Sequence, residues 1–224
     1  MRKLTKGPIP QILEENADLW TTEILAALDA GENPTNTQKR RYNHPQIKEA
    51  IVSENFGKCA YCESFVIHID FGDIEHLIPK SKVPSKAFLW SNLTLACRRC
   101  NVRKGDFHEG DDDHSGLVDP TVDDPEDHFT FHREIIAPIP GDPKGIKTFD
   151  VIDLGRGELI EKRRERLDFI NGLIGAYLGA DDEVKEILLA DLYKRSVRSD
   201  CEYSAFAAHY LNLLVNKGVI PEQP

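Results

Sequence analysis

The sequence has no long apolar run. None of its uninterrupted apolar stretches approaches the ~18–20 residues that a membrane-spanning helix needs, so we expect no transmembrane segment and no membrane partner. The basic start Met1–Lys6 is followed by Gly7-Pro-Ile-Pro10 instead of an apolar core, so we expect no secretory signal peptide. These absences predict a cytoplasmic protein.

The cysteines are too few and too unevenly placed for a disulfide framework. There are five, an odd number, and four of them form the pairs Cys59-Ala-Tyr-Cys62 and Cys97-Arg-Arg-Cys100. Two CxxC pairs in a reducing compartment are typical of a zinc site. A closed four-cysteine site has no open coordination position, so this zinc would organise the fold without activating water. For Cys201 we expect a small buried hydrophobe.

Charge of one sign is absent from two neighbouring stretches. Residues 80–104 contain no acid, and residues 106–127 contain ten Asp or Glu and no Lys or Arg. The net charge of −10 therefore does not exclude nucleic acid as a partner, because a phosphate backbone responds to the local field. A solvated basic face beside an acidic loop is the alternative. The candidate nucleic-acid-binding residues are Lys80, Arg98, Arg99, Arg103 and Lys104.

Apolar spacing predicts helices at both ends of the chain. Leu19 to Leu28 has a helical stripe that ends at Gly31, and a second helix should begin at Pro45 and end near Gly57. From Leu154 onward the pattern is helical, and its apolar stripes are typical of a core. We interpret 1–56 as an N-terminal helical segment.

The middle of the chain predicts short strands. We expect residues 65–67 to pair with 74–78 in a hairpin, and residues 92–104 to carry the second CxxC into a helix. Residues 129–131, 135–136 and 148–152 resemble a second small set of strands. The predicted class is α+β, with a core at 57–110 followed by an acidic loop, a β-hairpin and helices at 111–224.

His76 is the candidate for chemistry. A lone histidine in an apolar strand is usually a satisfied core residue, but His76 follows Glu75 and lies between the two CxxC pairs. Asn92 and Asn101 complete the set of polar residues. A carboxylate beside a histidine is the usual material for a metal ligand and a general base.

These residues resemble a known family. Glu75-His76-Leu-Ile-Pro79, Ser91-Asn92-Leu93 and Cys97-Arg-Arg-Cys100-Asn101 are similar to the HNH (ββα-metal) nuclease motif in its zinc-bearing form. Many HNH motifs have Asp where Glu75 stands and His where Asn101 stands. Most of the chain also resembles the PtuB-like HNH proteins of Septu and related retron anti-phage systems, through Lys58–Glu63, Leu117–Pro120 and Asp123–His128.

The resemblance implies a zinc-stapled ββα-metal core and metal-dependent hydrolysis of nucleic acid, DNA or else RNA. His76 would be the general base, and Glu75 and Asn101 would hold a catalytic Mg²⁺ or Mn²⁺. Asn92 would position His76. The PtuB-like resemblance also implies an ABC-type ATPase partner of the PtuA kind in a two-component defence system.

Two alternatives stay open at this point. One is a non-catalytic, zinc-organised nucleic-acid-binding or scaffolding module with a degenerate HNH site. The other is an HNH enzyme of the homing or restriction type that works alone, for which no additional recognition domain is visible in the sequence.

Overall fold

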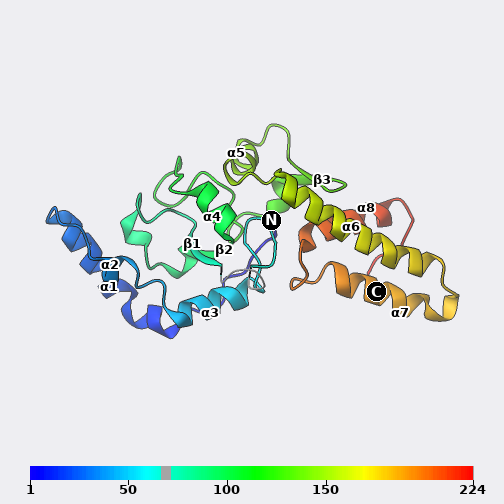
Figure 1. Ribbon diagram of the computed structural model, residues 1–224, viewed down its shortest axis with the longest axis horizontal. Coiled ribbons are helices and arrows are strands. Elements are labelled where there is room, and N and C mark those ends of the chain that lie inside the picture. The colour runs from blue at the N-terminus through cyan, green and yellow to red at the C-terminus, as the bar shows by residue number, and fades with distance from the viewer. Residues whose placement is uncertain (67–71, 224) are drawn as a thin grey trace.

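The computed structural model describes residues 1–66 and 72–223 and is elongated, with the small β-sheet near the middle (Figure 1). Helices α1 (Gln11–Asp29), α2 (Asn36–Lys39) and α3 (Pro45–Glu54) lie on one side of it. On the other side lie α6 (Gly157–Leu178), α7 (Asp182–Ser196) and α8 (Ser204–Asn216). The predicted helical ends and the α+β class are confirmed.

The central unit has the order strand, strand, helix. Strand β1 (Asp73–His76) pairs antiparallel with β2 (Leu93–Ala96), and α4 (Arg98–Lys104) follows. The predicted pairing of residues 65–67 with 74–78 is therefore wrong: β1 pairs with β2, and Phe65 forms an isolated bridge with Lys58. Ile67 lies outside the described residues.

The strand at Leu93–Ala96 was predicted as part of a helix. All four of its residues are buried, and a run of only four residues is too short for its periodicity to distinguish a strand from a helix. The helix begins only after Cys97, whose sulfur accepts a hydrogen bond from the Cys100 amide.

The second small sheet has two strands. Strand β3 (Phe129–His132) pairs antiparallel with β4 (Ile135–Pro138), but the predicted strand at 148–152 is the second half of helix α5 (Pro143–Ile152). Asp142 explains the difference, because its carboxylate accepts hydrogen bonds from the first amides of α5 and Pro143 suits the first helical position.

Three apolar clusters hold these elements together. The first surrounds the cysteines and packs α5 and the start of α6 against α4; the second packs α1 and α3 against β1 and β2. The third lies among α6, α7 and α8. None of the helices in the described ranges is long and apolar enough to cross a membrane.

Candidate active site and zinc centre

The four cysteines of the two CxxC pairs converge. Their sulfur atoms all lie within 4.8 Å of one another, and those of Cys62 and Cys97 are 3.9 Å apart. A tetrahedral zinc with bonds of about 2.3 Å requires sulfurs about 3.8 Å apart, so the cluster fits a zinc ion. The site joins the turn after α3 to the N-terminus of α4, as the sequence predicted.

Strand β1 directs neighbouring side chains to opposite faces, because side chains alternate along a strand. Asp73 and Glu75 face α4, where their partners are Asn101 and Lys104. Ile74 belongs to the cluster under α1 and α3, and the ring of His76 contacts Tyr42. Glu75 and His76 are adjacent in sequence but have different surroundings.

Glu75 is buried beside Lys104. Its Oε1 lies 2.7 Å from the Lys104 ammonium, which also donates a 2.8 Å hydrogen bond to the backbone oxygen of His76. That carboxylate oxygen nevertheless has no hydrogen bond of good geometry. Burial raises the pKa of Glu75 above its usual value, and the Lys104 ammonium only partly opposes the shift.

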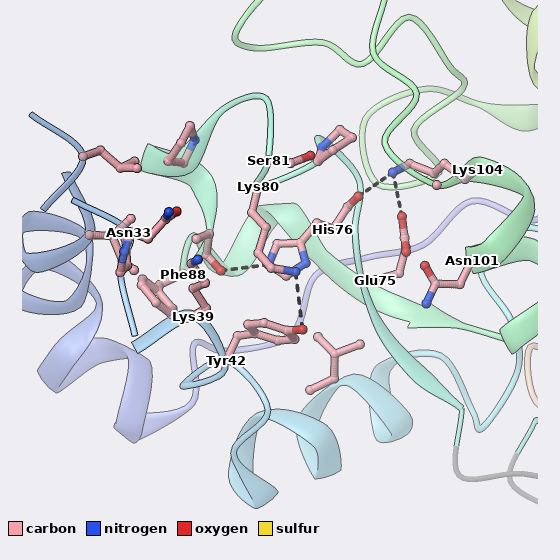
Figure 2. A pocket seen from close by; sticks show the side chains of 18 residues that line it. Asn33, Lys39, Tyr42, Glu75, His76, Lys80, Ser81, Phe88, Asn101 and Lys104 are labelled. Carbon is pink, nitrogen blue, oxygen red and sulfur yellow. Dashed lines mark hydrogen bonds and ion pairs between the residues drawn. The ribbon is translucent and has the colours of Figure 1, made fainter. Parts of the chain in front are cut away.

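Asn101 is held by an acid that the sequence analysis did not select. Its Nδ2 donates a 2.8 Å hydrogen bond to Oδ2 of Asp73, and this turns the amide oxygen toward the Glu75 carboxylate (Figure 2). Asp73 could have been found from its spacing, since residues two apart on a strand share a face. A buried carboxylate oxygen and an amide oxygen are ligands that Mg²⁺ and Mn²⁺ accept, so this group fits a hard divalent cation.

His76 has one nitrogen committed to the backbone. Its Nε2 lies 2.9 Å from the Ala87 carbonyl oxygen, and because a carbonyl only accepts, Nε2 carries the proton and Nδ1 carries the lone pair. Burial lowers the pKa of His76 to about 3, with the Lys80 ammonium adding to the shift. The imidazole is therefore neutral at physiological pH.

Asn92 fixes the loop that carries this carbonyl. Its Oδ1 accepts from the Ile78 amide at 2.7 Å, and its Nδ2 donates to the backbone oxygens of Ile78 and Lys86 at 3.0 and 2.9 Å. It is buried, and all three of these hydrogen bonds go to backbone groups. The positioning role of Asn92 stays a prediction.

A pocket of about 490 Å³ is lined by Glu75, His76, Asn101 and Lys104, whereas Asn92 and Asp73 lie outside its lining. Figure 2 shows Glu75, Asn101 and Lys104 on one side of His76, and Tyr42, Lys39 and Asn33 on the other. The second group comes from the N-terminal segment, and no pattern in the sequence indicated that this segment would reach the site.

The five basic residues expected to contact nucleic acid have different environments. Lys80 lines the pocket, and Arg98 is exposed. Arg99 and Arg103 form ion pairs with Glu158 and Asp153, at 2.6 and 2.9 Å. Lys104 is only 3% exposed and pairs with Glu75, so it does not lie on the exposed basic face where the sequence analysis put it.

A comparison with known protein families matches the part of the chain that contains β1, β2 and α4. Residues 59–107 match the family described as HNH endonuclease. These residues are an HNH domain. The domain includes the four cysteines of the CxxC pairs, the strands β1 and β2, and α4.

Two curated relatives resemble a larger part of the chain. The chain is 32% identical to the Septu protein PtuB of Bacillus thuringiensis, over 51% of this chain and 43% of that protein. It is 27% identical to the Septu protein PtuB of Bacillus mycoides, over 73% of this chain and 63% of that protein. The chain thus spans less than two thirds of the length of each of these relatives, and its similarity to them covers more of the chain than residues 59–107.

Proposed function

We propose that this protein is a metal-dependent HNH endonuclease that hydrolyses phosphodiester bonds of nucleic acid. The proposal depends mainly on one observation. In a single pocket, a neutral His76 whose ring is held by the Ala87 carbonyl lies beside Glu75 and Asn101, which offer oxygen ligands. The match of residues 59–107 to the HNH endonuclease family supports the reaction class.

In this proposal His76 is the general base. Its Nδ1 accepts a proton from water, while the bond from Nε2–H to the Ala87 carbonyl holds the ring and stabilises the charge that develops on it. A pKa of about 3 keeps the base unprotonated, at the cost of weaker basicity. Asn92 keeps the Ala87 carbonyl in place through its bonds to the same loop.

Glu75 and the Oδ1 of Asn101 would hold the divalent cation, and Asp73 orients the Asn101 amide. When bound, such an ion supplies charge stabilisation to the phosphate and the leaving oxygen. The ammonium of Lys104 now contacts the same Glu75 oxygen and has to share it or withdraw. Lys80 in the pocket and Arg98 on the surface would neutralise phosphates without reading sequence.

The relatives support a proposal about the biological setting. We infer that the protein is the effector of a two-component anti-phage system and acts with an ABC-type ATPase of the PtuA kind. The similarity to two Septu proteins named PtuB supports this, and co-purification with such an ATPase from the same host tests it.

One assay tests the reaction. Purified protein is incubated with DNA and with RNA in Mg²⁺ or Mn²⁺, beside a His76→Ala variant and an EDTA control, with and without the ATPase. We expect cleavage that both His76→Ala and EDTA abolish. Cleavage that His76→Ala leaves intact would remove His76 from the role of base.

The Lys104–Glu75 ion pair favours a second candidate, a non-catalytic zinc-organised binding module, because it already neutralises the acid. Binding of nucleic acid without cleavage in any metal, by protein that contains zinc, would support this candidate instead.

A further inference from the structure

The N-terminal segment lies outside the matched HNH domain, yet it forms one wall of the pocket. Lys39 and Tyr42 line the same pocket as His76 (Figure 2). The alternation of β1 explains this arrangement: Glu75 faces α4, whereas His76 faces the elements packed on the opposite side of the sheet, which are the N-terminal helices.

Tyr42 makes the closest ring contact with His76. The two ring centroids are 4.6 Å apart and the ring planes meet at 84°, an edge-to-face arrangement. The Ala87 carbonyl fixes the imidazole at Nε2, and Tyr42 limits its rotation about that contact. The orientation of the basic nitrogen therefore depends on a residue that the HNH domain does not supply.

Tyr42 also holds a cation. The Lys80 ammonium lies 4.5 Å from the centre of the Tyr42 ring and 3.4 Å from its hydroxyl oxygen. In the described part of the chain, neither Lys80 nor Lys39 forms an ion pair with a carboxylate. Four nearby cations outside the pocket do so, each with an acid within 3.3 Å: Lys82, Lys86, Arg99 and Arg103.

Cations left without acids in a concave pocket attract an anion. We propose that Tyr42 is a positioning residue of the active site and that, with Lys39 and Lys80, it forms a subsite for a nucleic-acid phosphate across His76 from Glu75. The identity of the anion rests on the proposed nuclease function. The subsite itself rests on the contacts of Tyr42 and the unpaired lysines.

Binding without cleavage tests the subsite. Fluorescence anisotropy of the zinc-containing protein without added Mg²⁺ or Mn²⁺, with labelled single-stranded DNA and RNA oligonucleotides, compares Lys80→Met with Lys82→Met. Both variants lose one positive charge, but Lys82 pairs with Asp106 and does not line the pocket. We expect Lys80→Met to weaken binding about fivefold or more, and Lys82→Met to change it less than about twofold. Equal effects would overturn the subsite.

Cleavage kinetics test the positioning role. Tyr42→Leu removes the ring, Tyr42→Phe removes only the hydroxyl, and Arg41→Met is the control, because Arg41 contacts Glu23 and Trp20 instead of the pocket. We expect Tyr42→Leu to lower kcat about tenfold, Tyr42→Phe to recover most of it, and Arg41→Met to leave kcat unchanged. Equal kcat values for Tyr42→Leu and Arg41→Met would refute the positioning role.

A spectroscopic readout separates the two proposals. The ¹⁵N shifts of the His76 ring report its tautomer, and we expect the Nε2–H form in the wild type and Tyr42→Phe but a mixture in Tyr42→Leu. If the wild type cleaves nothing, the nuclease proposal fails. The anisotropy measurements still test the phosphate subsite, and the His76 tautomer still tests the positioning role of Tyr42. Circular dichroism and zinc content verify that each variant is folded, and Tyr42→Phe and Lys80→Met change the packing least.

Discussion

At the scale of single residues, the site depends on buried polar groups that have few partners. Glu75, His76, Asn92 and Lys104 are all at most 5% exposed. A buried charge or amide that loses its partner costs far more than an exposed one, because water cannot replace the contact. Substitutions here should therefore affect stability as well as activity, and the two effects have to be measured separately.

Lys104→Met should destabilise the fold by about 3 kcal/mol, since it leaves the Glu75 carboxylate buried without its cation. Urea unfolding measures the loss. The double variant Glu75→Gln with Lys104→Met should recover much of it. Added Mn²⁺ should raise the Tm of Lys104→Met more than that of the wild type, because the ion takes the place of the ammonium. No Mn²⁺ effect on Tm would argue against Glu75 as a metal ligand.

Asn92→Ala should cost about 2–4 kcal/mol, because three backbone groups around His76 lose a partner. Asn92→Asp is the sharper variant: it keeps the acceptor for Ile78 but sets a carboxylate against two carbonyl oxygens. We expect it to be at least as unstable as Asn92→Ala. An Asn92→Asp protein with wild-type stability would mean that the amide is not needed as a donor.

At the scale of elements, the four-cysteine cluster joins the turn after α3 to α4, and α6 begins against it. Nη2 of Arg156, the residue that precedes α6, lies 3.4 Å from the sulfur of Cys100. A zinc ion with four thiolates has a net charge of −2, and this guanidinium compensates part of it. The C-terminal region is thereby attached to the metal centre.

Arg156→Met should speed the loss of zinc to a chromogenic chelator by about tenfold, since an outer contact of a metal ligand is removed. Arg166→Met is the control. Arg166 lies in α6, but its guanidinium donates to the backbone oxygens of Arg195 and Ser196 instead of contacting a cysteine. Identical rates for the two variants would show that Arg156 has no part in holding the metal.

Removal of zinc by a strong chelator should unfold the HNH domain but leave much of α6, α7 and α8 helical. Their shared cluster contains apolar residues such as Ile170, Leu192 and Leu211 and no cysteine. Far-ultraviolet circular dichroism should therefore lose only part of its helical signal. Complete loss of the helical signal in one transition would mean that the two parts fold as a unit.

At the scale of the whole molecule, charge is distributed so that acids from the C-terminal region neutralise the exposed face of α4. Arg99 pairs with Glu158, and Arg103 pairs with Asp153. Both contacts are exposed, so they hold the arginines only weakly. The net charge of −10 further opposes the approach of nucleic acid.

The variant Asp153→Asn with Glu158→Gln should raise affinity for nucleic acid several-fold at low salt, and the gain should shrink as salt increases. Glu161→Gln serves as the control, because Glu161 is also on α6 but pairs with Arg164. Anisotropy titrations at two salt concentrations measure the effect. An equal gain from Glu161→Gln would show that only net charge matters.

The sequence alone was enough to predict features that depend on residues close together in the chain. The CxxC spacing predicted which four cysteines meet, Pro45 and Gly31 marked helix ends, and the Glu75-His76 pair marked the candidate site. Side-chain chemistry and the helical period are enough to predict such features from a short stretch of sequence.

The contacts between distant segments became known from the tertiary structure. It paired β1 with the fully buried Leu93–Ala96, a run too short for its side-chain pattern to identify it as a strand. It buried Lys104 against Glu75, and it placed Tyr42 beside His76 across 34 residues of chain. Such contacts depend on which surfaces of the helices and strands pack together when the apolar clusters form. No local sequence pattern specifies that packing.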